Sequence, residues 1–92
     1  MLDLSKIISA LNSPTRREII KILAHNTMTV KQVAEQLSKK GLKLKYRESV
    51  YKNLEKLVDS GLVEKFYVRE KGMCYKLAKT MLKVNLQDWM VE

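Results

Sequence analysis

The sequence predicts a mainly α-helical domain that carries one small β-hairpin. Three observations support this fold class. Apolar residues recur at helical spacing in several separate segments, and a later segment alternates apolar and polar residues around a glycine-containing turn. The chain has 92 residues, which suffices for one domain with one small core. The expected order within this domain, residues 1–92, is helix, helix, short strand, helix, helix, hairpin, helix.

The composition limits the class of partner. Lysine and arginine outnumber the acidic residues 18 to 10, so the net charge of +8 favours a polyanionic partner, nucleic acid before a membrane surface. No apolar run approaches the roughly 20 residues of a membrane helix, and residues 1–11 lack the features of a signal peptide. The lone Cys74 excludes an intrachain disulfide framework. We therefore expect a cytoplasmic protein without a membrane partner.

Two helices are expected at the beginning of the chain. The first covers about residues 3–12, where four aliphatic side chains form one stripe. The second runs from about Pro14 to Ala24. Ser13 is a good N-cap for it, and proline suits the first helical position because its missing N–H would be unpaired there.

A third helix is expected after a short apolar bridge at Met28, which fits one or two strand residues. Thr29 has the properties of an N-cap, and Gln32, three residues later, completes a capping-box pattern with it. The polar residues and glycine of segment 38–41 then end the helix.

A fourth helix lies within the segment from Lys43 to Leu62. Its apolar residues form one stripe, its basic and hydrogen-bonding residues lie off that stripe, and Gly61 suits a left-handed cap. A helix that enters the major groove of DNA needs this combination, because phosphates attract cations and base edges need donors and acceptors. The alternative is an ordinary surface helix with solvated lysines.

The next segment predicts a β-hairpin with a charged tip, because two alternating runs flank residues 69–72. The third and fourth helices then form a helix-turn-helix, and the hairpin is a wing. The last segment fits two structures. Leu82, Leu86, Trp89 and Met90 have helical spacing, whereas Leu82, Val84 and Leu86 alternate as in a strand. We predict a helix over residues 79–90, since the segment is long and lacks strong turn residues.

Four segments together cover most of the chain and carry a family resemblance. They are LNSPTRREIIKIL (Leu11–Leu23), TVKQVAEQL (Thr29–Leu37), SVYKNLEKLVDSGLVEK (Ser49–Lys65) and GMCYKLA (Gly72–Ala78). In this order they resemble the ArsR-type winged helix-turn-helix regulators of the MarR/ArsR superfamily. The chain departs from that pattern in its longer, lysine-rich link at residues 38–46. It also lacks the metal-sensing motifs, with no Cys-x-Cys in the third helix and no histidine in the last segment, so neither a metal nor another cofactor is expected.

The resemblance implies a sequence-specific, double-stranded DNA-binding transcription regulator, a repressor that acts as a homodimer. The fourth helix would enter the major groove and the wing would contact the backbone or the minor groove. Two alternatives stay open. The chain could be a non-specific architectural DNA-binding protein, or a winged-helix protein-interaction module of a larger complex.

The candidate DNA contacts fall into three sets. The recognition helix, where Arg, Lys, Asn and Glu have the chemistry to pair with base edges, supplies Arg47, Glu48, Ser49, Tyr51, Lys52 and Asn53. The loop before it supplies Lys39, Lys40, Lys43, Lys45 and Tyr46 for the backbone, and the wing supplies Arg69 and Lys71. Arg16, Arg17 and Lys31 are weaker phosphate candidates near helix starts. The alternatives are that Tyr51 packs on the domain, that Glu48 only favours the helix dipole, and that the loop lysines are solvated.

The terminal helices, 3–12 and 79–90, are the candidate dimer interface, because the first and last helices form a two-fold interface in the resembled family. The residues are Leu4, Ile7, Ile8, Leu11, Leu82, Leu86, Trp89 and Met90. The alternative is that they close the monomer's own core. An enzyme is not expected. One histidine and one cysteine cannot form a four-ligand zinc site, and a Cys–His pair would need a third orienting group.

Overall fold

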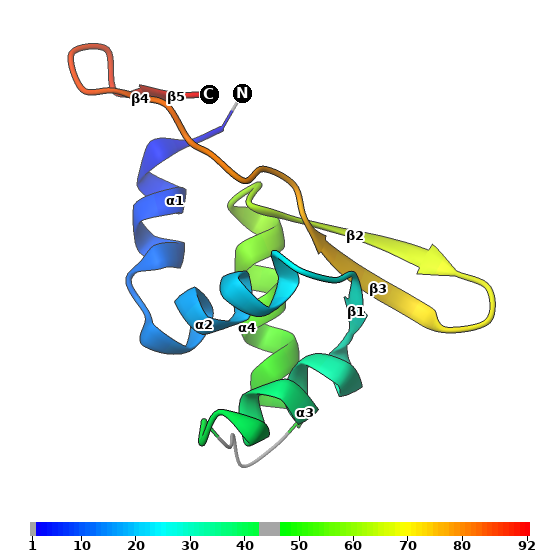
Figure 1. Ribbon diagram of the computed structural model, residues 1–92. Helices are drawn as coiled ribbons and strands as arrows, with labels where there is room; N and C mark the ends of the chain where they lie inside the picture. The colour runs from blue at the N-terminus through cyan, green and yellow to red at the C-terminus, as the bar shows by residue number, and fades with distance from the viewer. Residues whose placement is uncertain (1, 43–46) are drawn as a thin grey trace.

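The computed structural model describes residues 2–42 and 47–92 and has the predicted order of elements up to the wing. The helices are α1 (Leu4–Leu11), α2 (Pro14–Leu23), α3 (Val30–Lys39) and α4 (Arg47–Asp59). The strands are β1 (Met28–Thr29), β2 (Val63–Val68), β3 (Gly72–Leu77), β4 (Val84–Asn85) and β5 (Met90–Val91). The four helices group together, the β2–β3 hairpin projects from them, and the β4–β5 hairpin lies beside the beginning of α1 (Figure 1).

The helix ends follow the capping residues predicted from the sequence. The Ser13 side chain accepts a hydrogen bond from the backbone N–H of Arg16 at 3.2 Å. Thr29 and Gln32 form the complete capping box, with bonds of 2.9 and 3.2 Å. Gly61 follows α4 with a φ of +84°, the left-handed conformation that glycine adopts without steric cost.

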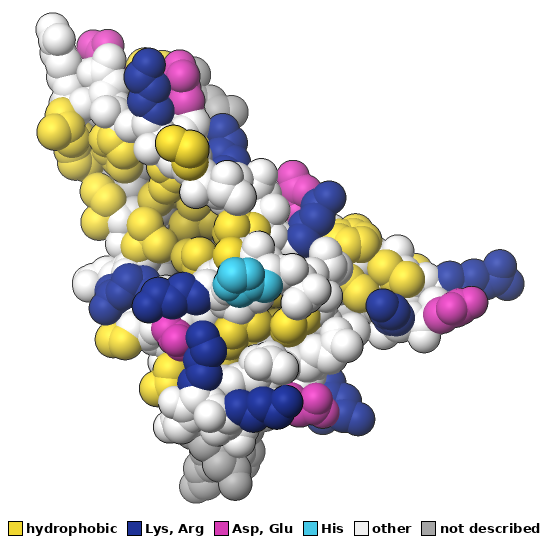
Figure 2. Space-filling model, viewed as in Figure 1, with side chains coloured by type: hydrophobic (Ala, Val, Ile, Leu, Met, Phe, Trp, Pro, Cys, Tyr) yellow, Lys and Arg dark blue, Asp and Glu magenta, His cyan; other side chains and the backbone are white. Residues whose placement is uncertain are grey.

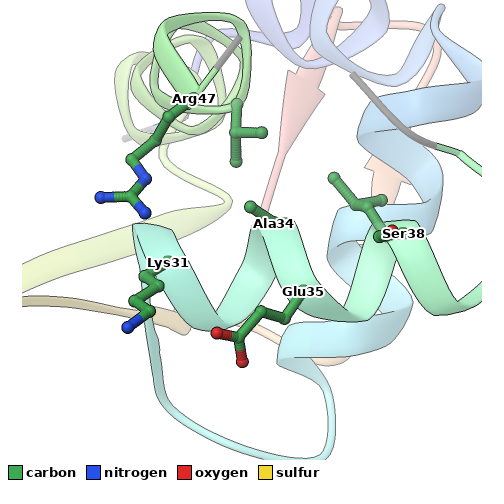
Figure 3. Close-up of a pocket in the computed structure, with 7 residues that line it drawn as sticks. Lys31, Ala34, Glu35, Ser38 and Arg47 are labelled. Atoms are coloured by element: carbon green, nitrogen blue, oxygen red, sulfur yellow. The ribbon is translucent and has the colours of Figure 1, made fainter. Parts of the chain in front are cut away.

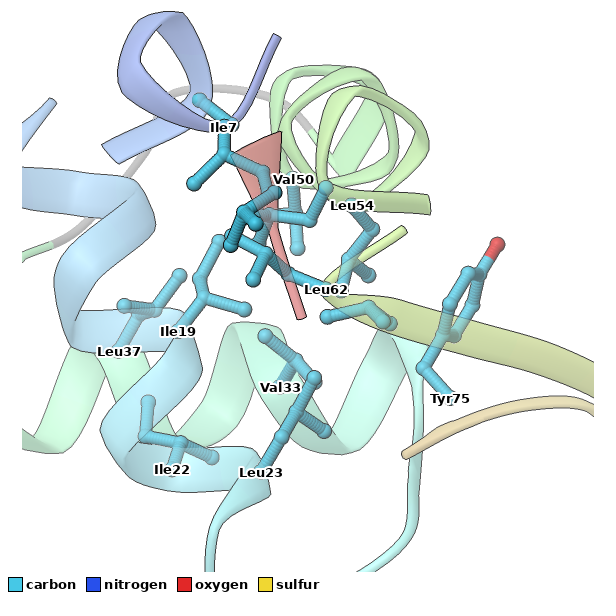
Figure 4. Packing of buried hydrophobic residues seen from close by; sticks show 14 of the residues in the cluster. Ile7, Ile19, Ile22, Leu23, Val33, Leu37, Val50, Leu54, Leu62 and Tyr75 are labelled. Atoms are coloured by element: carbon cyan, nitrogen blue, oxygen red, sulfur yellow. The ribbon is translucent and has the colours of Figure 1, made fainter. Parts of the chain in front are cut away.

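One hydrophobic core holds the helices against the base of the wing. Figure 4 shows side chains from all four helices converging with Leu62 and with Tyr75 of β3. Ile19, Leu54 and Leu57 are fully buried there, and each such side chain contributes about 1.5–3 kcal/mol relative to an exposed one. Because α4 packs on α1, α2, α3 and β2, its inner face is fixed and its outer face is presented to solvent.

The wing is part of a three-stranded antiparallel sheet in the order β1-β3-β2. Strand β3 pairs with β2 along its whole length, from Val63↔Leu77 to Val68↔Gly72. The short strand at Met28 pairs with Tyr75 on the other edge of β3. The predicted hairpin and the predicted one or two strand residues at Met28 are both confirmed.

The predicted helix over residues 79–90 is wrong. The segment forms a second antiparallel hairpin, β4–β5, and Val91 makes a further bridge to Leu2. Its turn is held by side chains: Asn85 accepts a hydrogen bond from the backbone N–H of Asp88 at 3.1 Å and donates to the Asp88 carboxylate at 3.2 Å. Asparagine and aspartate are turn formers, and here their local hydrogen bonds outweigh the helical spacing of the apolar residues. Within residues 2–42 and 47–92 the fold therefore consists of four helices and two hairpins.

Candidate nucleic-acid interface

The outer face of α4 presents most of the predicted base-contacting side chains. Arg47, Glu48, Tyr51 and Lys52 are exposed, and Ser49 is half-buried beside them. Three buried aliphatic residues on the opposite side of α4 anchor the helix in the core. Glu48 and Lys52 form an i,i+4 ion pair of 3.5 Å, but both side chains are about three-quarters exposed. Such a solvated pair is weak, so either group can exchange its partner for DNA.

A shallow hollow between α3 and α4 extends this face. Its volume is about 240 Å³, and its lining includes Lys31, Glu35 and Ser38 of α3 together with Arg47. The cationic ends of Lys31 and Arg47 lie on the same side of the hollow (Figure 3). Two cations on neighbouring helices can contact one stretch of phosphate backbone. The geometry therefore raises Lys31, a weaker candidate from the sequence, to a member of the interface.

Asn53 does not lie free on the recognition face, contrary to the prediction. Its amide oxygen accepts a hydrogen bond from Arg16 Nη1 at 3.0 Å, and its amide nitrogen donates to the Ser49 carbonyl at 2.8 Å. The side chain is half-buried. Asn53 therefore links α4 to α2, and its amide is engaged within the domain instead of facing a base edge.

Arg16 and Arg17 also have internal roles. The Arg16 guanidinium donates to the carbonyl oxygens of Ala10 at 2.7 Å and Ser9 at 3.2 Å, and Arg17 donates to that of Leu11 at 2.7 Å. These carbonyls belong to the last turn of α1, where cations stabilise the helix dipole. The two arginines are therefore placed as caps of α1, and the phosphate contact considered for them lacks geometric support.

The lysines at the C-terminal end of α3 differ in their surroundings. Lys39 is exposed at the end of α3. Lys40 contacts Glu18 of α2 at 3.0 Å, and this hydrogen bond lowers the pKa of the Glu18 carboxyl. The Lys40 ammonium therefore lies against α2, whereas Lys31 lines the hollow beside α4. Three further candidates lie outside the described residues: Lys43, Lys45 and Tyr46.

The tip of the wing carries the two predicted cations. Arg69 and Lys71 are exposed in the turn between β2 and β3, and Glu70 lies between them. In Figure 2 the far end of the projecting hairpin carries dark blue and magenta, that is basic and acidic, side chains. Gly72 has a φ of +87°, which permits the tight turn between β2 and β3.

Glu55 of α4 was missed by the sequence reasoning. Its carboxylate accepts hydrogen bonds from Lys65 Nζ at 2.7 Å and from the Tyr75 hydroxyl at 3.2 Å. Burial, and next the negative charge of Glu55, raise the pKa of Tyr75 to about 12, while the hydrogen bond to Glu55 raises the pKa of Lys65. No local sequence pattern predicts this cluster, because Glu55, Lys65 and Tyr75 lie on three different elements.

The candidate dimer residues fall into three groups. Leu4 and Ile7 are only 5% and 2% exposed and belong to the monomer core, so for them the prediction is corrected. Leu11 and Leu82 are half-buried against that core. The side chains that remain exposed are Ile8, Leu86, Trp89 and Met90. Met81 and Val84, which are not among the predicted residues, are also exposed, so exposed apolar side chains occur on α1, on the terminal hairpin and in the segment just before it.

Two further observations concern the described residues only. None of the helices in this part of the chain has both the length and the apolar character needed to cross a membrane. No three of its histidine, cysteine and acidic side chains gather closely enough to hold a metal ion. Cys74 is buried on β3.

Comparison with known proteins adds one positive finding. No curated protein matches the chain. A family model described as a helix-turn-helix domain matches residues 11–65, more than half of the chain, from the end of α1 to the beginning of the wing. That span includes both helices of the motif, and a DNA-binding helix-turn-helix places the second of them in the major groove. The chain therefore belongs to the helix-turn-helix domain family.

Proposed function

We propose that this protein is a cytoplasmic, sequence-specific transcription regulator that binds double-stranded DNA as a homodimer and represses transcription. Helix α4 enters the major groove, and the wing contacts the backbone or the minor groove. The ArsR-type resemblance supports the dimer and the repressor role. The family match supports the coarser statement, a DNA-binding regulator with a helix-turn-helix.

The outer face of α4 carries the proposal. It presents Arg47, Glu48, Tyr51 and Lys52 to solvent while the buried side locks the helix in place. Arginine and lysine can pair with guanine, and glutamate can accept from cytosine. Lys31 beside Arg47 supplies a backbone contact that fixes the register of the helix in the groove.

The homodimer is supported by the apolar surface on α1 and the terminal hairpin. Leu86 is 76% exposed and Met81 is 84% exposed, and Trp89 and Ile8 are about half exposed. A surface of this kind favours association. A two-fold axis through this surface would present two copies of α4 to one pseudo-palindromic site.

Selection of bound duplexes from a random pool tests the proposal. We expect an enriched palindrome whose half-sites are centred about 10–10.5 base pairs apart, or a multiple of that spacing. Arg47→Ala should relax the preference at one position per half-site, at a cost of about 1–3 kcal/mol. The matched control is Lys21→Ala, which removes an exposed cation from α2 and should leave the preference unchanged.

Two results would replace the proposal. Equal affinity for selected and scrambled duplexes at the same salt concentration would identify a non-specific architectural DNA-binding protein. Failure to bind any duplex at low salt would identify a protein-interaction module, since the electrostatic contribution of a cationic surface is strongest under that condition.

A further inference from the structure

One carboxylate on α4 holds both strands of the wing at the same level. Lys65 of β2 and Tyr75 of β3 are direct partners in the antiparallel register, and both donate to Glu55. Lys65 binds Oε1 and Tyr75 binds Oε2, so the two oxygens are each engaged by a different strand. We name this three-residue contact, Glu55–Lys65–Tyr75, the wing clamp.

We propose that Glu55 is a positioning residue that fixes the direction of the wing relative to α4, so that both elements reach one duplex together. The proposal rests on the proposed DNA-binding function. Glu55 lies one helical turn after Tyr51, at the edge of the exposed face of α4. The clamp therefore joins the wing to the same helix that reads the groove.

The length of the wing makes its direction matter. Val68↔Gly72, the last pair before the turn, lies three positions along the strands from Lys65↔Tyr75, so the tip is at least about 10 Å beyond the clamp. A small rotation at the base is amplified over that length. The cations Arg69 and Lys71 would then lose their alignment with the phosphate backbone while α4 stayed in place.

The contact with Lys65 also compensates the negative charge of Glu55. An unpaired carboxylate beside the recognition face would repel phosphate. In the structure the Glu55 side chain is 29% exposed and its charge is compensated by Lys65, itself 39% exposed. A tyrosine hydroxyl is neutral and can donate at pH 7, and burial raises the pKa of Tyr75 to about 12, so it remains a donor well above neutral pH.

A second wing ion pair supplies the matched control. Glu64 of β2 contacts Lys76 of β3 at 3.7 Å, and these residues are also direct register partners. Their side chains lie on the other face of the hairpin from Lys65 and Tyr75, because successive residues of a strand alternate between faces. Glu64→Ala therefore removes a comparable pair within the wing and leaves the wing clamp intact.

The first test measures distance without DNA. Spin labels are attached at Lys52→Cys and Lys71→Cys in a Cys74→Ala background. The labelled chain is diluted into an excess of unlabelled chain, so that the recorded label–label distribution comes from distances within one protomer. We expect one narrow distribution for the parent and for Glu64→Ala, and a broadened or displaced one for Glu55→Ala. The paired change Lys65→Met with Tyr75→Phe, which keeps apolar bulk, should broaden it as well. Unchanged distributions in both clamp variants would overturn the proposal.

The second test is a double-mutant cycle on duplex affinity at one salt concentration, at temperatures where each variant is folded. Removing Arg69 and Lys71 should weaken binding about tenfold in the parent but less than about twofold in Glu55→Ala, since coupled groups are non-additive. Equal losses in both backgrounds would reject the positioning role. If the parent binds no duplex, the proposed function fails and the distance measurement alone decides the role of Glu55.

Discussion

The protein has two β-hairpins that differ in length, anchoring and surface. The wing has strands of six residues, is tied to α4 by the wing clamp, and ends in Arg69, Glu70 and Lys71. The terminal hairpin has strands of two residues. It is joined to the segment before α1 by the bridge to Leu2 and to α1 by a hydrogen bond of 3.3 Å from Trp89 Nε1 to Ser5.

The two hairpins present surfaces of different chemistry, which would suit two kinds of partner. The wing presents charge at its tip, which suits a polyanion. The terminal hairpin presents Leu86, Trp89 and Met90, which suit an apolar surface. If the proposed function is correct, changes in the wing should affect DNA binding directly, and changes in the terminal hairpin should affect assembly. Each hairpin therefore supplies control variants for the other.

The largest expected effect follows from Leu86→Glu. The residue is 76% exposed in the monomer, so the charge should not disturb folding. At a dimer interface it would be buried without a partner, which costs several kcal/mol, so we expect the dimer dissociation constant to rise by about 100-fold or more. Sedimentation equilibrium measures this constant.

The control for that variant lies on the other hairpin. Tyr67 of the wing is similarly exposed, at 69%, and Tyr67→Glu should leave the oligomeric state unchanged. A Leu86→Glu protein that remains dimeric at the same concentration would show that the terminal hairpin is not the interface.

The next effect concerns the tip of the wing. We expect Arg69→Ala with Lys71→Ala to weaken binding to all duplexes about equally, and to reduce the slope of log affinity against log salt by about two units per bound protomer, one for each phosphate that is no longer neutralised. Lys83→Ala removes a positive charge from the terminal hairpin instead and should leave the slope unchanged. An unaltered slope in the wing variant would mean that its cations do not contact phosphate.

A pH dependence distinguishes the anchors of the two hairpins. Burial and Glu55 raise the pKa of Tyr75 to about 12 in the folded protein, above the value of about 10 in the unfolded chain. Folding therefore favours the neutral hydroxyl. This contribution to stability is fully present below pH of about 10 and is lost as the pH rises from there through about 12.

Denaturant unfolding of the parent and of Tyr75→Phe across this pH range measures that contribution. Both proteins will lose stability from their other ionising groups, so the difference between them is the informative quantity. We expect the parent to lose more than the variant. Parallel losses would show that the Tyr75 hydroxyl is not held neutral by the fold.

The two hairpins also show what local sequence can predict. The wing was predictable because alternation continues through six residues on each side of a turn that contains Gly72. In the last segment the apolar residues fit both periods, and two-residue strands are too short for alternation to decide. The turn depends on Asn85 and Asp88 and on Trp89, which has a φ of +55°. A tryptophan in the sequence does not predict a positive φ, because residues other than glycine rarely adopt it.

The position of the candidate site could be predicted from the sequence, but the hydrogen-bond partners of some of its side chains could not. Helical spacing placed Arg47, Tyr51 and Lys52 on the outer face of α4, as the structure has them. The partners of Asn53 and Glu55 could not be read locally, because Arg16 lies 37 residues from Asn53 and Tyr75 lies 20 residues from Glu55. Such tertiary contacts decide whether a polar side chain faces DNA or the domain itself.

The smallest expected effect is the change in the free energy of unfolding caused by Asn85→Ala. Its sign distinguishes the hairpin from the helix in the last segment. In the hairpin this change removes the exposed hydrogen bonds to Asp88 and should lower the free energy of unfolding by about 0.5–1 kcal/mol. In a helix it would raise stability, because alanine exceeds asparagine in helix propensity by up to roughly 0.7 kcal/mol. Gln87→Ala, in the same exposed turn, is the matched control. Denaturant unfolding gives the sign of the change. A stabilised Asn85→Ala protein would support the predicted helix over the terminal hairpin, and the comparison between the two hairpins would then fail.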